Sequence, residues 1–99
     1  MTKDDNWPNW PEQEFSHAGI LLKLTCGACP EQYDAFDGAG KRVGYFRLRH
    51  GWFTVRYPDV GGKLVYEAGP NGDGQFNNDE REGFLIAGIE ALKKEMNDG

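Results

Sequence analysis

Cysteine is scarce in this sequence, and neither a long apolar run nor an excess of positive charge is present. The two cysteines, Cys26 and Cys29, are too few and too close together for the disulfide framework of a small secreted protein. No apolar stretch approaches the ~20 residues that a membrane-spanning helix requires. The first residues are acidic and interrupted by proline, unlike a signal peptide. We therefore expect a cytoplasmic protein without a membrane partner.

Basic residues are outnumbered: 11 Lys and Arg face 16 Asp and Glu, which gives a net charge of −5. The mean field of such a chain repels polyanions and disfavours non-specific nucleic-acid binding by the molecule as a whole. Common catalytic motifs are also missing, because the chain has no GxSxG, no HExxH and no glycine-rich phosphate loop between a strand and a helix. We expect a non-enzymatic protein that needs no cofactor.

The aromatic content is sufficient for one hydrophobic core. A chain of 99 residues with three Trp, four Tyr and six Phe can build a single domain but not two. Residues 1–16 hold four acids and two prolines without apolar periodicity, so we predict a flexible tail there and a single domain over 17–99. A tandem Asn-Trp-Pro repeat places Trp7 and Trp10 in this tail. These tryptophans either cover an apolar edge of the domain or bind a partner.

The pattern of the remaining chain predicts an α+β fold. Short β-branched or aromatic segments separated by Gly, Pro and Asp predict an antiparallel meander of about five strands, at 20–25, 31–37, 42–49, 52–57 and 63–68. The last segment has helical periodicity, and Asn77 with Glu80 resembles a capping box at its start. We expect this single C-terminal helix to pack on the sheet through Phe84, Leu85, Ile89, Leu92 and Met96.

The central hairpin has two different faces. Alternation on both sides of His50-Gly51 predicts a two-residue turn, which sets Phe46 opposite Val55 and Leu48 opposite Phe53 beneath the helix. The other face then carries what we call the basic aromatic face, made of Tyr45, Arg47, Arg49, Trp52 and Arg56.

Charge is concentrated around this hairpin. Residues 38–57 contain five Lys or Arg and no acid, so this stretch is +5 and the remainder of the chain −10. One interpretation is structural, with cation–π pairs between Arg49 and Trp52 and between Arg56 and Tyr45, and with Asp34 and Glu67 neutralising the remaining charge. Another is a contact surface for a protein or an anion, and a third is a platform on which single-stranded nucleic acid stacks.

Residues 69–80 resemble the calcium-binding loop of EF-hand and dockerin proteins. Asn71, Asp73 and Glu80 occupy ligand positions, and a helix follows. Gly69 stands where the first ligand is normally Asp, which removes one ligand and one charge. The alternative is a glycine-rich connection that leads into a capped helix.

The Cys26-Gly27-Ala28-Cys29 motif permits three interpretations. It could supply half of a zinc site, with His17 and His50 as further ligands, or it could be a redox dithiol. It could also be an inert turn, because it follows a strand and is ended by Pro30 instead of opening a helix.

Several segments resemble small uncharacterised proteins of bacteria and their phages. These are Pro-Glu-Gln-Tyr-Asp at 30–34, Val-Gly-Tyr-Phe-Arg-Leu-Arg-His-Gly at 43–51, Val-Tyr-Glu at 65–67 and Gly-Asp-Gly at 72–74, within a region of resemblance that covers about residues 30 to 92. The resemblance implies an accessory protein of a phage or mobile element that binds another macromolecule, and it supplies no catalytic residues.

The leading hypothesis is therefore an interaction module that contacts a protein partner through the basic aromatic face, together with Trp7 and Trp10. A small metal-binding domain that holds Ca²⁺ in the 69–80 loop or Zn²⁺ at Cys26 and Cys29 is the alternative. Nucleic-acid binding and a small enzyme are less favoured. Homodimerisation is also open, because an open meander has two sheet edges that must be covered, charged or paired.

Overall fold

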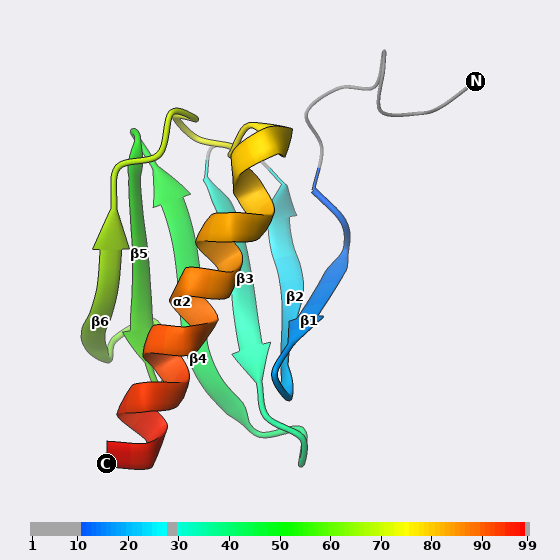
Figure 1. Ribbon diagram of the computed structural model, residues 1–99, viewed down its shortest axis with the longest axis vertical. Coiled ribbons are helices and arrows are strands. Elements are labelled where there is room, and N and C mark those ends of the chain that lie inside the picture. Colours follow the sequence, from blue (N-terminus) through cyan, green and yellow to red (C-terminus); the bar gives the residue numbers. More distant parts are fainter. Residues whose placement is uncertain (1–10, 28–29, 99) are drawn as a thin grey trace.

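The computed structural model describes residues 11–27 and 30–98, and within them the chain forms an antiparallel sheet with a helix on one face (Figure 1). The strands lie in the sheet in their sequence order. The elements are β1 (Glu14–His17), β2 (Ile20–Gly27), β3 (Glu31–Phe36), β4 (Arg42–Arg49), β5 (Trp52–Tyr57), β6 (Lys63–Ala68) and α2 (Asn78–Asp98). The α+β class, the meander and the C-terminal helix are confirmed.

The described sheet has six strands where about five were expected, and the additional strand is β1. It begins at Glu14, inside the segment predicted as a tail, and pairs with β2 so that Phe15 lies opposite Leu22. Ala18 and Gly19 form the turn, both with positive φ (54° and 85°). The sequence pattern does not indicate β1, because a strand of four residues with one large apolar side chain has too little alternation to detect. Residues 1–10 of the expected tail lie outside the described residues.

The predicted register of the central hairpin is confirmed at every pair. Leu48 lies opposite Phe53 and Phe46 opposite Val55, and all four side chains are fully buried beneath α2. Both residues of the turn have positive φ, 54° at His50 and 73° at Gly51. This is the requirement of a type I′ turn, whose twist matches that of the flanking strands.

Helix α2 begins immediately after Asn77, as the capping box predicted. The Glu80 carboxylate accepts the backbone N–H of Asn77 at 3.0 Å, which satisfies one of the donors left over at a helix start. The helix packs mainly on β4, β5 and β6, and Leu85, Ile89 and Leu92 are buried at this interface. The predicted apolar face is confirmed, and Phe84 and Met96 are partly buried at its margins.

The centre of the core is an aromatic cluster around Phe53. Its ring centroid lies 5.0 Å from that of Phe76, 5.9 Å from Tyr66, 6.0 Å from Phe46 and 6.3 Å from Phe84. The cluster joins the sheet, the loop that precedes the helix and the helix itself. No described element covers the opposite face of the sheet (Figure 1).

Candidate functional site

The basic aromatic face lies on the side of the sheet away from α2. Arg49 is directly opposite Trp52, Tyr45 is opposite Arg56, and Arg47 is opposite Thr54, so the five predicted residues share two neighbouring strands. Trp52 is 57% exposed, although it is one of the largest apolar side chains in the chain. Trp7 and Trp10, the other predicted contacts, lie outside the described residues.

Two of the five residues make contacts within the domain. The Tyr45 hydroxyl donates to Gln32 Oε1 at 2.5 Å, and Arg56 Nη1 donates to the Gly62 carbonyl at 3.1 Å. Among the described residues neither Arg49 with Trp52 nor Arg56 with Tyr45 forms the expected cation–π pair; the pair that does form places Lys23 Nζ 5.5 Å from the Phe36 ring centroid.

Arg47 and Arg49 have no hydrogen bond or ion pair with any described residue. They alternate along β4 and therefore stand ~7 Å apart on one face. In the structural interpretation, Asp34 and Glu67 would neutralise the charge of these arginines, but neither carboxylate pairs with Arg47 or Arg49. Asp34 is paired with Arg42 at 3.2 Å, and Glu67 lies opposite Thr54, two strand spacings (~10 Å) from Arg47. Within residues 11–27 and 30–98, two guanidinium groups thus have no partner.

An open cleft of about 260 Å³ lies beside Trp52. It is lined by Trp52, Glu67, Ala68 and Gly69, where β6 ends next to the start of β5. Because Trp52 is opposite Arg49, an apolar recess and two cations occupy the same end of the sheet. Exposed Trp and Arg are the residue types that most often dominate binding energy at protein interfaces.

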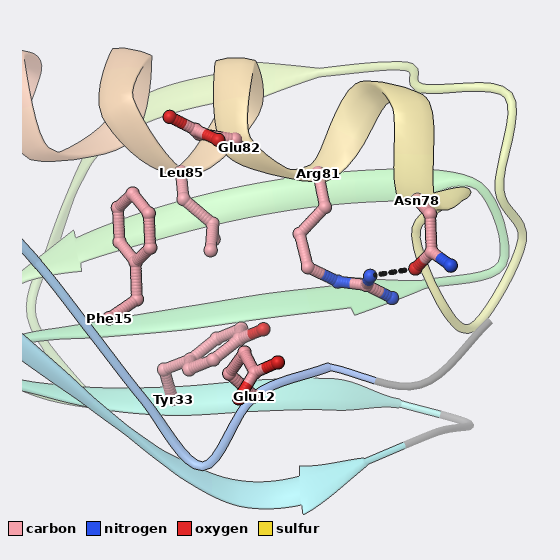
Figure 2. Close-up of a pocket in the computed structure, with 7 residues that line it drawn as sticks. All are labelled: Glu12, Phe15, Tyr33, Asn78, Arg81, Glu82 and Leu85. Carbon is pink, nitrogen blue, oxygen red and sulfur yellow. Dashed lines mark hydrogen bonds between the residues drawn. The ribbon is translucent and has the colours of Figure 1, made fainter. Parts of the chain in front are cut away.

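A second pocket, of about 170 Å³, lies between β1 and α2 (Figure 2). Tyr33 on β3, Phe15 on β1 and Leu85 on α2 supply its apolar walls. The polar lining consists of Glu12, Asn78, Arg81 and Glu82. No local sequence pattern indicates this pocket, since its residues come from three separate segments of the chain.

A buried ion pair lies next to this pocket. Glu31 is fully buried and accepts hydrogen bonds from Arg81 Nε at 2.8 Å, Arg81 Nη2 at 3.1 Å, the Phe76 backbone N–H at 2.9 Å and the Tyr33 hydroxyl. Arg81 also donates to Asn78 Oδ1 at 2.5 Å, which Figure 2 shows, and to the Phe76 carbonyl at 2.9 Å. Every polar side-chain atom buried in the described residues is satisfied, which indicates a structural network.

The signal for this network was present in β3. Glu31 alternates with Tyr33 and Ala35 on the buried face, so strand periodicity placed a carboxylate where only a partnered charge is stable. Burial, then the hydrogen bond to Glu31, raises the pKa of Tyr33 far above its usual value. The hydroxyl therefore stays protonated and donates to the carboxylate at all physiological pH.

In the 69–80 loop, the Glu80 carboxylate binds backbone N–H groups of the loop itself. Glu80 Oε1 accepts the N–H of Asn71 at 2.9 Å, and Oε2 accepts those of Gly72 at 2.7 Å and Asn77 at 3.0 Å. Both oxygens of the predicted calcium ligand thus face the positive ends of N–H dipoles. Asp73 lies instead at the hairpin turn, where its carbonyl accepts the Gly51 N–H at 2.7 Å. We therefore do not propose a calcium site in this loop.

These hydrogen bonds make Glu80 a pH-dependent contributor to stability. Desolvation raises the pKa of Glu80, but the backbone N–H groups of Asn77, Asn71 and Gly72 outweigh it and hold the pKa below the usual glutamate range. A depressed folded-state pKa stabilises the fold above the unfolded-state pKa, near ~4.3, and this contribution is lost as pH falls through the folded-state value.

We expect Glu80→Gln to lower the free energy of unfolding at neutral pH by about 1 kcal/mol, a typical capping contribution. Its difference from the native protein should shrink as the pH falls below ~4. Urea unfolding followed at several pH values measures this. Glu82→Gln removes an exposed acid from the same helix and serves as the control. An equal, pH-independent loss in both variants would contradict the role assigned to Glu80.

The cysteine motif begins at the end of β2, where Cys26 lies opposite Gln32; Cys29 lies outside the described residues. His17 is opposite Ile20 at the other end of β2, ~20 Å along the strand from Cys26. Its Nε2 atom is 2.8 Å from Glu90 on α2. His17 therefore cannot share a metal with Cys26. Within residues 11–27 and 30–98, no three His, Cys, Asp or Glu side chains are grouped to hold a metal ion.

The fold and the site together define a small α+β domain in which a helix closes one face of a meander. The other face presents an exposed tryptophan beside two arginines that have no partner among the described residues. Searches against protein-family models, curated proteins and solved structures return no match to this chain. Among the described residues, no helix is long and apolar enough to cross a membrane.

Proposed function

We propose that this protein is a non-enzymatic interaction module that binds a protein partner through the basic aromatic face. The observation that carries the proposal is the pair Arg47 and Arg49, unpaired within the described residues, next to the exposed Trp52. The resemblance to small phage and bacterial proteins agrees with an accessory protein that acts on another macromolecule. Trp7 and Trp10 belong to the proposed contact surface as additional aromatic side chains.

The expected free-energy contributions of Trp52 and the two arginines are large enough for binding at this face. Complete burial of the exposed part of Trp52 would contribute about 2–3 kcal/mol. Exposed ion pairs contribute only about 0.2–1 kcal/mol each, so the arginines mainly orient the partner and accelerate association. Trp52 is therefore expected to supply most of the affinity and the two arginines most of the selectivity.

The test is the double charge reversal Arg47→Glu/Arg49→Glu. It should abolish cross-linking of the tagged protein to its partner in cells of its natural host, and it should change the melting temperature little, because surface substitutions usually alter stability by less than about 0.5 kcal/mol.

A matched variant separates local charge from net charge. Lys41→Glu/Lys94→Glu produces the same net charge by reversing two exposed lysines, in the β3–β4 connection and on α2. This variant should retain the cross-linked partner. Equal loss in both variants, or retention in the Arg47/Arg49 variant, would contradict the proposed site.

A further inference from the structure

We infer that the partner presents an acidic segment whose carboxylates bind Arg47 and Arg49 and whose apolar side chain occupies the cleft beside Trp52. This inference rests on the proposed function and names the chemistry that the same site recognises. Three observations support it: most basic side chains on the open face already have a contact, Arg47 and Arg49 have a fixed spacing, and an apolar cleft lies beside them.

On the open face, the basic side chains without a contact to a described residue are next to each other on β4. Lys23 lies over Phe36, Arg42 is paired with Asp34, and Arg56 donates to a backbone carbonyl. The remaining cations are Arg47 and Arg49, with no bond to any described residue. A complementary ligand therefore needs two negative charges close together rather than a long row of them.

The spacing of the two arginines matches that of carboxylates in a polypeptide. Arg47 and Arg49 stand ~7 Å apart along β4, and alternate side chains of an extended segment repeat at the same distance. Acids one helical turn apart are also separated by about 6 Å. Each guanidinium can then bind one carboxylate in the bidentate geometry that favours arginine over lysine.

The cleft adds an apolar position to this acidic pattern. Trp52, Ala68 and Gly69 provide its apolar lining, and Trp52 is directly opposite Arg49. A side chain of leucine size next to the acids of the segment would cover the exposed indole and fill the recess. An anchor in a pocket, flanked by charged contacts, is the usual anatomy of a binding hot spot.

Single-stranded nucleic acid fits this site less well. Glu67 lines the cleft and repels any negative charge next to the group that enters it. A polynucleotide carries a phosphate on every nucleotide, whereas a peptide can place its acids on the Arg47 and Arg49 side alone. Outside residues 38–57 the chain carries a charge of −10, which repels the rest of a polynucleotide. A peptide can contact Arg47 and Arg49 without extending a charged backbone across the acidic surface around them.

Fluorescence anisotropy with labelled probes tests the inference on the intact chain. The probes are a short peptide of Asp and Glu with one central Leu, the same peptide with Ser in place of Leu, a Lys-for-acid counterpart and an oligothymidylate. We expect the acidic leucine peptide to bind best, roughly tenfold more tightly than the serine peptide, and to weaken as salt is added. The lysine peptide should not bind.

Two variants test the charged contacts and the apolar contact separately. Arg47→Glu/Arg49→Glu should weaken both acidic peptides by about tenfold or more, whereas Lys41→Glu/Lys94→Glu should not. Trp52→Ala should remove the preference for leucine over serine and retain the dependence on salt.

Tighter binding of oligothymidylate than of the acidic leucine peptide would overturn the inference in favour of nucleic acid. If no peptide binds while cellular cross-linking still depends on Arg47 and Arg49, the acidic-segment inference is wrong, but the proposed function survives. If cross-linking does not depend on these arginines, the proposed function itself fails.

Discussion

Arg81→Met is expected to lower the free energy of unfolding by about 3–5 kcal/mol, a large part of the stability of a domain this size. The substitution leaves the Glu31 carboxylate fully buried and without the guanidinium that accounts for two of its hydrogen bonds. It also removes the bond from Arg81 to the Phe76 carbonyl, so the loop that leads into α2 loses an attachment. Urea denaturation measures the loss.

Two comparisons isolate the buried charge as the cause. Arg47→Met removes an arginine from the open face, where no hydrogen bond to a described residue is lost, and should change stability by less than about 0.5 kcal/mol. Glu31→Gln/Arg81→Met removes both charges and should be more stable than Arg81→Met alone. If Arg81→Met costs no more than Arg47→Met, the buried network does not stabilise the fold as described.

Gly88→Val is expected to destabilise the domain by about 3 kcal/mol, the upper end of the usual cost of overpacking. A Cβ atom at Gly88 would lie 2.7 Å from the Phe46 ring and 2.9 Å from a Val55 methyl, closer than such contacts occur. The helix would have to move off the sheet. Thermal melting followed by near-ultraviolet circular dichroism would report both the loss and the altered aromatic packing.

Gly83→Val is the matched control, because it makes the same change in the same helix. No atom lies within 4 Å of a Cβ built at Gly83, so the variant should be neutral or slightly more stable through better helix propensity. Equal destabilisation at both positions would mean that valine is unfavourable in α2 for reasons other than packing on Phe46 and Val55.

These stability variants and the binding variants act on opposite faces of one sheet. Glu31 and Gly88 belong to the helix side, whereas Arg47 and Arg49 lie on the open side. Because alternate residues of β4 point to different faces, the open face can be recharged without disturbing Phe46 and Leu48 between its arginines. This separation makes loss of binding at constant stability a meaningful result.

Features that depend on neighbouring residues could be predicted from the amino-acid sequence. Alternation around His50-Gly51 set the hairpin register, since a slip of one residue would expose Phe46, Leu48, Phe53 and Val55 together. The helix start was predicted because a cap and its partner, Asn77 and Glu80, lie within one turn. The five residues of the basic aromatic face followed from the same alternation.

Which of those side chains are available to a partner depends instead on contacts between segments far apart in the sequence. Sequence proximity suggested that Arg49 and Arg56 would pair with aromatic neighbours, but Arg56 donates to the loop carbonyl of Gly62, and Arg49 has no hydrogen bond or ion pair with any described residue. The partner of Glu31 lies 50 positions away at Arg81, and the cleft beside Trp52 is lined by residues at the end of β6. Periodicity indicates which face of the sheet a residue occupies. The distance between residues remote in sequence depends on how the chain packs, and that packing leaves Arg47 and Arg49 without a partner among the described residues.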